Sequence, residues 1–472
     1  MKTNNHQWIL NGPVKHVLLR VSYPMLAAIF LLFAYDVLEA QLLSQISLEA
    51  ITALGFTIPV TTAMAAFAIA ITITTNTAVT KAISKHQHRA EPLIINSLIV
   101  AILTSIIFAT LGYAFNQTIF EFLGINYAML PDSYHQGPRP QLMPLIENYM
   151  TWRYVGLVFL VLIWQINSLL RAVGLINYAG TTFVLWMLCK ILLALALFND
   201  LLPRPTCPLE TAALIHIICD ALFAIIGLYL LCKKLDINRL THVKIEPVKT
   251  FRRLSVVGVP ATMQQILTPL SITLLTIMVV SYGQVYVALL GIVFRLEMLL
   301  LLVPMVLTTA LPSIIGVNWW SGQYLRVRLF MRHAKNTVII SQLIVALLLY
   351  IYAPQIAAWF ATDSTIAKNI IIYLQLVPIS FIAAGITIIS QSSLNASGHY
   401  GKASLISVFH RIIFKMSCCY LGLTLGGIQG LFIGIISAHI LSALLTLVMS
   451  RVFTLKAHQQ TLTEQSDSQT MP

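Results

Sequence analysis

Apolar residues gather in long runs along this chain, separated by short polar segments. About twelve runs are long enough to cross a bilayer, because a span needs about 20 apolar residues at 1.5 Å of rise each. The runs cover residues 17–41, 50–82, 93–113, 149–173, 176–198, 209–231, 254–280, 285–319, 337–353, 370–394, 403–425 and 428–452. The second and the eighth exceed one span, which indicates tilt or extension beyond the bilayer. The pattern predicts an all-α polytopic membrane protein with 12 transmembrane helices.

Composition agrees with this prediction. Hydrophobic residues make up 58% of the 472 residues and charged residues only 10%, whereas soluble domains have roughly 25% charged residues. The first fifteen residues are polar and carry no cleavage-site pattern, so we expect the first run to be a retained helix.

The positive charge is distributed unevenly between the segments that join the runs. With the N-terminus inside, 21 of the 29 lysines and arginines fall in inside segments, against three outside: Arg139, Arg204 and Lys368. This bias predicts a multi-pass protein of the inner (plasma) membrane with both termini cytoplasmic, and it argues against a nucleic-acid partner. The six cysteines show no zinc-type spacing, so no metal is expected.

The two halves of the sequence repeat each other. A shift of 236 residues places Pro24 over Pro260, and a shift of 224 places "LLRAVG" (169–174) over "SLNASG" (393–398). Each half holds six spans, and an even number gives both halves the same orientation. We therefore expect two six-helix lobes related by a pseudo-two-fold axis along the membrane normal, with a substrate cavity between them.

These observations divide the chain into five parts. The two lobes are the N-terminal lobe 17–232 and the C-terminal lobe 254–452. The three cytoplasmic parts are an N-terminal segment 1–16, a charged linker 233–253 and a disordered tail 453–472.

Several stretches resemble multidrug and toxic compound extrusion (MATE) transporters. They are "YPMLAAIFLLFAYDVLEAQLLSQISLEAITALGFTIP", "RLSVVGVPATMQQIL", the eighth run ending in "GVNWWSG", and the paired "LLRAVG" and "SLNASGHYGKA". The resemblance implies a monomeric antiporter, not an enzyme, without a cofactor. It would export bulky organic cations or amphipathic drugs in exchange for protons or, alternatively, sodium. Where many members carry an Asn and an Asp four residues apart in helix five, Lys190 and Ala194 stand here.

Two acids end the first run, in "FAYDVLEA". An ionisable residue inside a span costs about 2.5–3.5 kcal/mol and usually faces a cavity or a partner. Asp36 lies about 27 Å along this helix, in the outer half of the bilayer, and burial would favour its neutral form. Both the depth and the resemblance make Asp36 the candidate ion-coupling acid. We expect Glu39 nearer the headgroups, in a gating or structural role.

Three more ionisable residues complete the candidate coupling site. His216 and Asp220 are four residues apart and share a helix face, which suits either a proton relay or a hydrogen-bonded pair between helices. Lys190, about 21 Å into its helix, either snorkels toward the inner headgroups or pairs with Asp36 or Asp220. A paired ammonium would take the place of a sodium ion, and protons would couple transport. Arg295 and Glu297, two residues apart, are assigned gating or structural roles.

Aromatic and methionine side chains could line a drug cavity, and packing is the other explanation for each of them. The six candidates are Tyr35, Met64, Phe67, Tyr154, Trp164 and Trp186. No phosphate-binding loop of the type Gly-x-x-x-x-Gly-Lys-Ser/Thr occurs, so an ion gradient must supply the energy. The alternatives are a lipid-linked precursor flippase of a related superfamily and, with less support, a polytopic membrane enzyme.

Overall fold

The regular structure of the described residues is helical. The computed structural model describes residues 4–46, 48–85, 90–122, 142–199, 201, 207–234, 246–280, 282, 284–360, 364–456 and 459. The first half contains α1 (Asn4–Asn11), α2 (Val14–Ile46), α3 (Leu48–Lys85), α4 (Ala90–Ala114), α5 (Asn116–Phe122), α6 (Leu142–Ala172), α7 (Ile176–Phe198) and α8 (Pro208–Lys234). The second half contains α10 (Pro247–Val280), α11 (Gln284–Leu300), α12 (Leu302–Trp320), α13 (Tyr324–Phe360), α14 (Ser364–Leu376), η4 (Pro378–Ser380), α15 (Phe381–Ala396), α16 (Tyr400–Val408), η5 (Phe409–Phe414) and α17 (Lys415–Met449).

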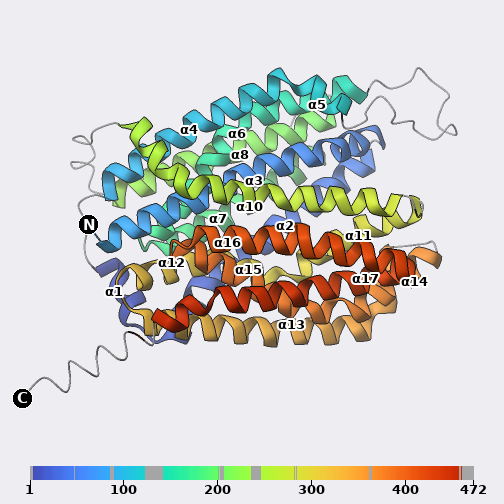
Figure 1. Cartoon of the computed structure of the whole chain (residues 1–472). Helices are drawn as coiled ribbons and strands as arrows, with labels where there is room; N and C mark the ends of the chain where they lie inside the picture. The colour runs from blue at the N-terminus through green and yellow to red at the C-terminus, as the bar shows by residue number, and fades with distance from the viewer. Residues whose placement is uncertain are drawn as a thin grey trace, which may run out of the picture.

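The long helices lie side by side in one bundle, with α4, α6 and α8 at one side and α13 and α17 at the other (Figure 1). Eleven stretches of the described residues are long and apolar enough to span a membrane. The last, Tyr400–Lys456, has 57 residues, or about 86 Å of helix, nearly three times the hydrocarbon thickness.

This last stretch folds back on itself and therefore crosses twice. The backbone is non-helical at Gly426 and Gly427, where φ of Gly427 is +57°, a value that favours glycine. A methyl group at Gly422 would collide with the carbonyl oxygen of Gly430, so glycine allows the two arms to approach closely. Counting both arms gives the twelve spans that the sequence predicts.

Two predicted runs are interrupted helices. The run 285–319 consists of α11 and α12, which meet at Leu301, so its length reflects two helices and not one tilted span. The run 370–394 consists of α14, η4 and α15, and it breaks where Pro378 begins η4. Proline lacks the N–H that would continue the helical hydrogen bonds.

Buried apolar side chains separate largely by halves. One cluster extends from Ala28 to Leu231, within the first half. Two others belong mostly to the second half, but one of them also contains Ile9, from α1, and Val17, from the start of α2. Arg326 of α13 donates to the carbonyl oxygens of Ile9 (2.9 Å) and Gly12 (2.8 Å). The α1 end of the bundle therefore joins the two halves.

The internal repeat is visible in the backbone. The turns after α6 and α15 carry Gly174 and Gly398 with φ of +84° and +85°. In each turn the glycine N–H bonds to the carbonyl oxygen three residues back, at 3.0 Å and 3.1 Å. The matched turns confirm the shift of 224 residues.

Some predicted boundaries move. Residues 235–245 of the predicted linker lie outside the described residues, but Lys249, Arg252 and Arg253, which we had placed in that linker, belong to α10. Of the predicted tail, residues 453–456 are helical, after a turn at Ser450, and residues 457, 458 and 460–472 lie outside the described residues. The predicted segment 1–16 contains α1.

The predicted orientation can be tested by cysteine labelling of intact cells. In a variant whose six native cysteines are replaced, Cys207 included, a cysteine between 235 and 245 should resist a membrane-impermeant thiol reagent. A cysteine between 127 and 141 should react, because the charge bias places that loop outside. The reverse labelling pattern would contradict the orientation.

Candidate functional site

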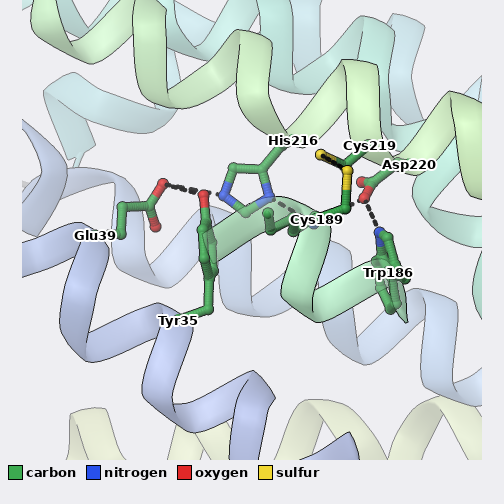
Figure 2. A network of polar contacts seen from close by, with 8 residues as sticks. Tyr35, Glu39, Trp186, Cys189, His216, Cys219 and Asp220 are labelled. Carbon is green, nitrogen blue, oxygen red and sulfur yellow. Dashed lines mark hydrogen bonds and ion pairs between the residues drawn. The ribbon is translucent and has the colours of Figure 1, made fainter. Parts of the chain in front are cut away.

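Helices α2, α7 and α8 bring ionisable side chains together inside the first half. Asp220 and His216 come from α8, Lys190 from α7 and Glu39 from α2. The Lys190 Nζ lies 2.7 Å from Asp220 Oδ1 and 3.0 Å from His216 Nδ1, and His216 Nε2 lies 3.1 Å from Glu39 Oε1. Figure 2 shows Glu39, His216 and Asp220 along this line. We call Glu39, His216, Lys190 and Asp220 the α2–α7–α8 network.

Lys190 is paired within the protein and does not snorkel. The side chains of Lys190 and Asp220 are 3% and 2% exposed. Trp186 lies one turn before Lys190 on α7, and its indole N–H donates to the same Asp220 Oδ1 at 2.9 Å. The Lys190 Nζ also lies 4.6 Å from the centroid of the Trp186 ring, where cation–π attraction stabilises it. Of the two partners predicted for Lys190, the structure shows Asp220 and not Asp36.

The contacts of His216 define its tautomer. A lysine ammonium has only donors to offer, so His216 Nδ1 accepts from Lys190. The other ring nitrogen, Nε2, then carries the proton and donates to Glu39 Oε1. His216 is therefore neutral in this arrangement, and it links the acid of α2 to the ion pair between α7 and α8.

Glu39, and not Asp36, is the α2 acid within the network. Its side chain is buried, and its Oε1 also accepts from the Tyr35 hydroxyl at 3.4 Å. That Glu39 lies nearer the headgroups than Asp36 stays a prediction. Tyr35 and Glu39 are four residues apart, on the face of α2 turned toward α8. Asp36 points elsewhere, is exposed, and bonds to no residue that the structure describes. It remains within electrostatic reach of Glu39 and Lys190.

Arg153 of α6 is a further member that we did not predict. Its guanidinium lies 5.9 Å from the centroid of the Tyr149 ring and within electrostatic reach of Glu39 and Asp220. Its Nε is buried without a hydrogen-bond partner in the described part of the chain. The sequence held one signal, a basic residue inside a run, but no periodicity showed which helix it would face.

The predicted cavity residues form part of the core in this conformation. Four of them, Tyr35, Met64, Tyr154 and Trp186, are at most 2% exposed, and Phe67 and Trp164 pack partly against the same cluster. A groove of about 1000 Å³ lies instead between α7 and α8, lined mainly by apolar side chains such as Leu185, Leu192 and Phe223. None of the six predicted residues lines this groove.

Of the three residues assigned gating or structural roles, Glu39 belongs to the network, whereas Arg295 and Glu297 belong to α11. Glu297 is half-buried on α11, in the second half, within electrostatic reach of Tyr373. The Arg295 side chain lies outside the described residues. Their gating role stays a prediction.

Comparison with known proteins identifies relatives over most of the chain. The MatE family model matches residues 24–196 and 260–421, and the two matches begin 236 residues apart, as the repeat predicts. A protein of Shewanella oneidensis named FAD transporter is 25% identical over 90% of this chain and 92% of its own length. The multidrug export protein MepA of Staphylococcus aureus is 19% identical over 95% of this chain and 96% of its own.

Solved structures share the fold. The Vibrio cholerae MATE transporter VcmN in its bent form has a TM-score of 0.81, 23% identity, and coverage of 94% of this chain and 98% of that one. A Pyrococcus furiosus transporter of the MOP superfamily has a TM-score of 0.83, 18% identity, and coverage of 97% and 99%. With twelve spans, an internal repeat and a family match to both halves, the chain belongs to the MatE family of membrane transporters.

Proposed function

We propose that this transporter is a proton-coupled antiporter of the plasma membrane that works by alternating access. The observation that carries the proposal is the buried Lys190–Asp220 pair, joined through His216 to Glu39. The ammonium of Lys190 holds the position that a metal cation would need beside Asp220. A sodium ion would have to displace it, whereas a proton can bind without displacing any side chain.

The charges of the site suit the uptake of one proton. Asp36, Glu39 and Asp220 contribute three negative charges when ionised, and Lys190 and Arg153 contribute two positive charges, while His216 is neutral. One proton would therefore neutralise the site. Neutral clusters cost less to bury than charged ones, so protonation favours a conformation in which the site is closed to water.

Within the network the proton has a continuous path. Asp36 is exposed and would receive it first, passing it to Glu39 one turn away on α2. A protonated Glu39 attracts the Nε2–H of His216 less strongly, because a charge-assisted hydrogen bond becomes a neutral one, and this weakens the link between α2 and α8. Exchange becomes obligatory if proton and substrate favour different conformations of these helices.

The substrates that we propose are bulky organic compounds. The names of the relatives suggest two kinds, multidrug substrates and FAD, and the sequence resemblance suggests organic cations or amphipathic drugs. Transport of ethidium and of FAD by the purified protein, each measured with the other as competitor, would show which of the two kinds of substrate the protein prefers. A flippase would move a lipid-linked compound instead, and chemical change in the cargo would indicate an enzyme.

The coupling ion can be measured in proteoliposomes. Substrate efflux by the unmodified protein should follow an imposed pH gradient and should not change when sodium replaces potassium at constant pH. The physical reason is that Lys190 already neutralises Asp220. Transport driven by a sodium gradient alone would contradict proton coupling but would leave the family assignment intact.

A further inference from the structure

Arg171 is a buried arginine with no acidic partner among the residues that the structure describes. Its side chain is 6% exposed, and it is the residue before the last of α6. Its Nη1 lies 3.9 Å from Met25 Sδ. Its Nε has no hydrogen-bond partner among the described residues. Buried charges are normally paired, because an unpaired one loses its hydration without compensation.

Asn167 lies one turn before Arg171 on the same face of α6. It is 1% exposed, and neither its amide nitrogen nor its amide oxygen bonds to any part of the chain that the structure describes. Two buried polar side chains, side by side and both unsatisfied, are unusual in a folded protein. They offer a guanidinium fork and an amide N–H to an acceptor that the described residues do not supply.

The internal repeat shows what satisfies the corresponding residues in the second half. The shift of 224 matches Asn167 with Gln391 and Arg171 with Asn395. Both of these donate to Gln264 Oε1, at 3.0 Å and 2.9 Å. The shift of 236 matches Gln264 of α10 with Ala28 of α2, whose methyl side chain accepts no hydrogen bond.

The local packing supports this correspondence. Ser404 of α16 contacts Pro260, since its hydroxyl lies 3.4 Å from the Pro260 carbonyl oxygen. In the first half the matched residues also meet, because a methyl group at Gly180 would collide with the Pro24 ring. The two halves thus share one arrangement. The second half completes it with Gln264, and the first half does not.

We propose that Arg171 and Asn167 bind a phosphate group, carried either by a membrane lipid or by a soluble phosphorylated compound. An arginine fork binds a phosphate through two parallel charge-assisted hydrogen bonds, and the Asn167 amide adds a third donor. Met25, which contacts Arg171, packs against Val306 of α12. The site therefore lies close to the contact between the halves, and its route of entry rests on the proposed alternating access.

The site can be tested by ligand-induced stabilisation of the full chain in detergent. The probes are inorganic pyrophosphate and dihexanoylphosphatidylglycerol, with dioctanoylglycerol as the lipid that lacks phosphate. A bound probe raises Tm with concentration. We expect at least one phosphate probe to raise Tm. In Arg171→Gln, the probe concentration needed for the same rise in Tm should be at least about tenfold higher. Arg332→Gln, which removes an exposed arginine from α13, should respond like the unmodified protein.

A second variant distinguishes loss of the phosphate site from loss of folding. Ala28→Gln combined with Arg171→Asn reproduces the Gln264 and Asn395 pair of the second half, so it should keep Tm without probe and lose the response. A response to phosphatidylglycerol alone identifies a lipid headgroup as the source, and a response to pyrophosphate alone identifies a soluble phosphorylated compound. No response of the unmodified protein to either probe, or equal responses in all variants, would overturn the proposal. Because no transport is measured, the result is independent of the antiport proposal.

Discussion

Lys190→Ala is expected to abolish proton-driven efflux and to lower thermal stability. The substitution leaves Asp220, 2% exposed, without its 2.7 Å partner, and removing one member of a buried ion pair costs about 3–5 kcal/mol. Lys190→Arg should be less impaired, because it keeps the charge although its planar group fits the Asp220 and His216 contacts less well. Efflux from proteoliposomes and Tm in detergent measure the two effects.

A double variant separates the structural role of Lys190 from its role in coupling. Lys190→Ala with Asp220→Asn removes both charges, so most of the lost stability should return while proton-driven efflux stays absent. Lys249→Ala is the control, since Lys249 is 78% exposed in its ion pair with Glu246 and such pairs contribute little. Full efflux in Lys190→Ala would exclude the network from proton coupling.

The spans and the repeat were predictable because they depend on the order of residues along the chain and not on how the helices pack. A bilayer requires about 20 apolar residues per crossing whatever the packing. The repeat is recognisable because matched residues such as Pro24 and Pro260 stand at the same position in the first run of each half. The breaks at Leu301 and before Pro378 were not predictable. A proline within a long apolar run either kinks a helix or ends it, and its neighbours decide which. Pro24 and Pro260 lie inside continuous helices.

The candidate site was predicted in part. Helical spacing placed His216 and Asp220 on one face, and the depth of Lys190 favoured a partner, but the sequence left Asp36 and Asp220 both open; the structure shows Asp220. The sequence could not show which face of α2 turns inward. The same holds for the other helices: no periodicity showed that Arg153 of α6 faces Glu39, and of the two explanations for the six cavity candidates, a drug cavity or packing, the structure in this conformation shows packing.

Asp36→Asn is expected to abolish proton-driven exchange while Tm stays unchanged. Asp36 is exposed and bonds to no described residue, so the nearly isosteric amide removes a titratable charge and no contact. Efflux should lose its dependence on the pH gradient, measured over a range of internal and external pH. Glu121→Gln is the matched control, because Glu121 is an exposed acid of α5 that only bonds to Gln117.

Glu39→Gln tests the next step of the proton path. A glutamine can still accept from the His216 Nε2–H, so the network should keep its geometry, but it cannot take up a proton near neutral pH. We therefore expect the same loss of pH-driven efflux as in Asp36→Asn, together with substrate binding close to that of the unmodified protein. If Asp36→Asn keeps pH-driven efflux while Glu39→Gln loses it, protons reach Glu39 without Asp36. If both variants keep it, neither acid of α2 couples transport, and the proposed proton path through α2 is excluded.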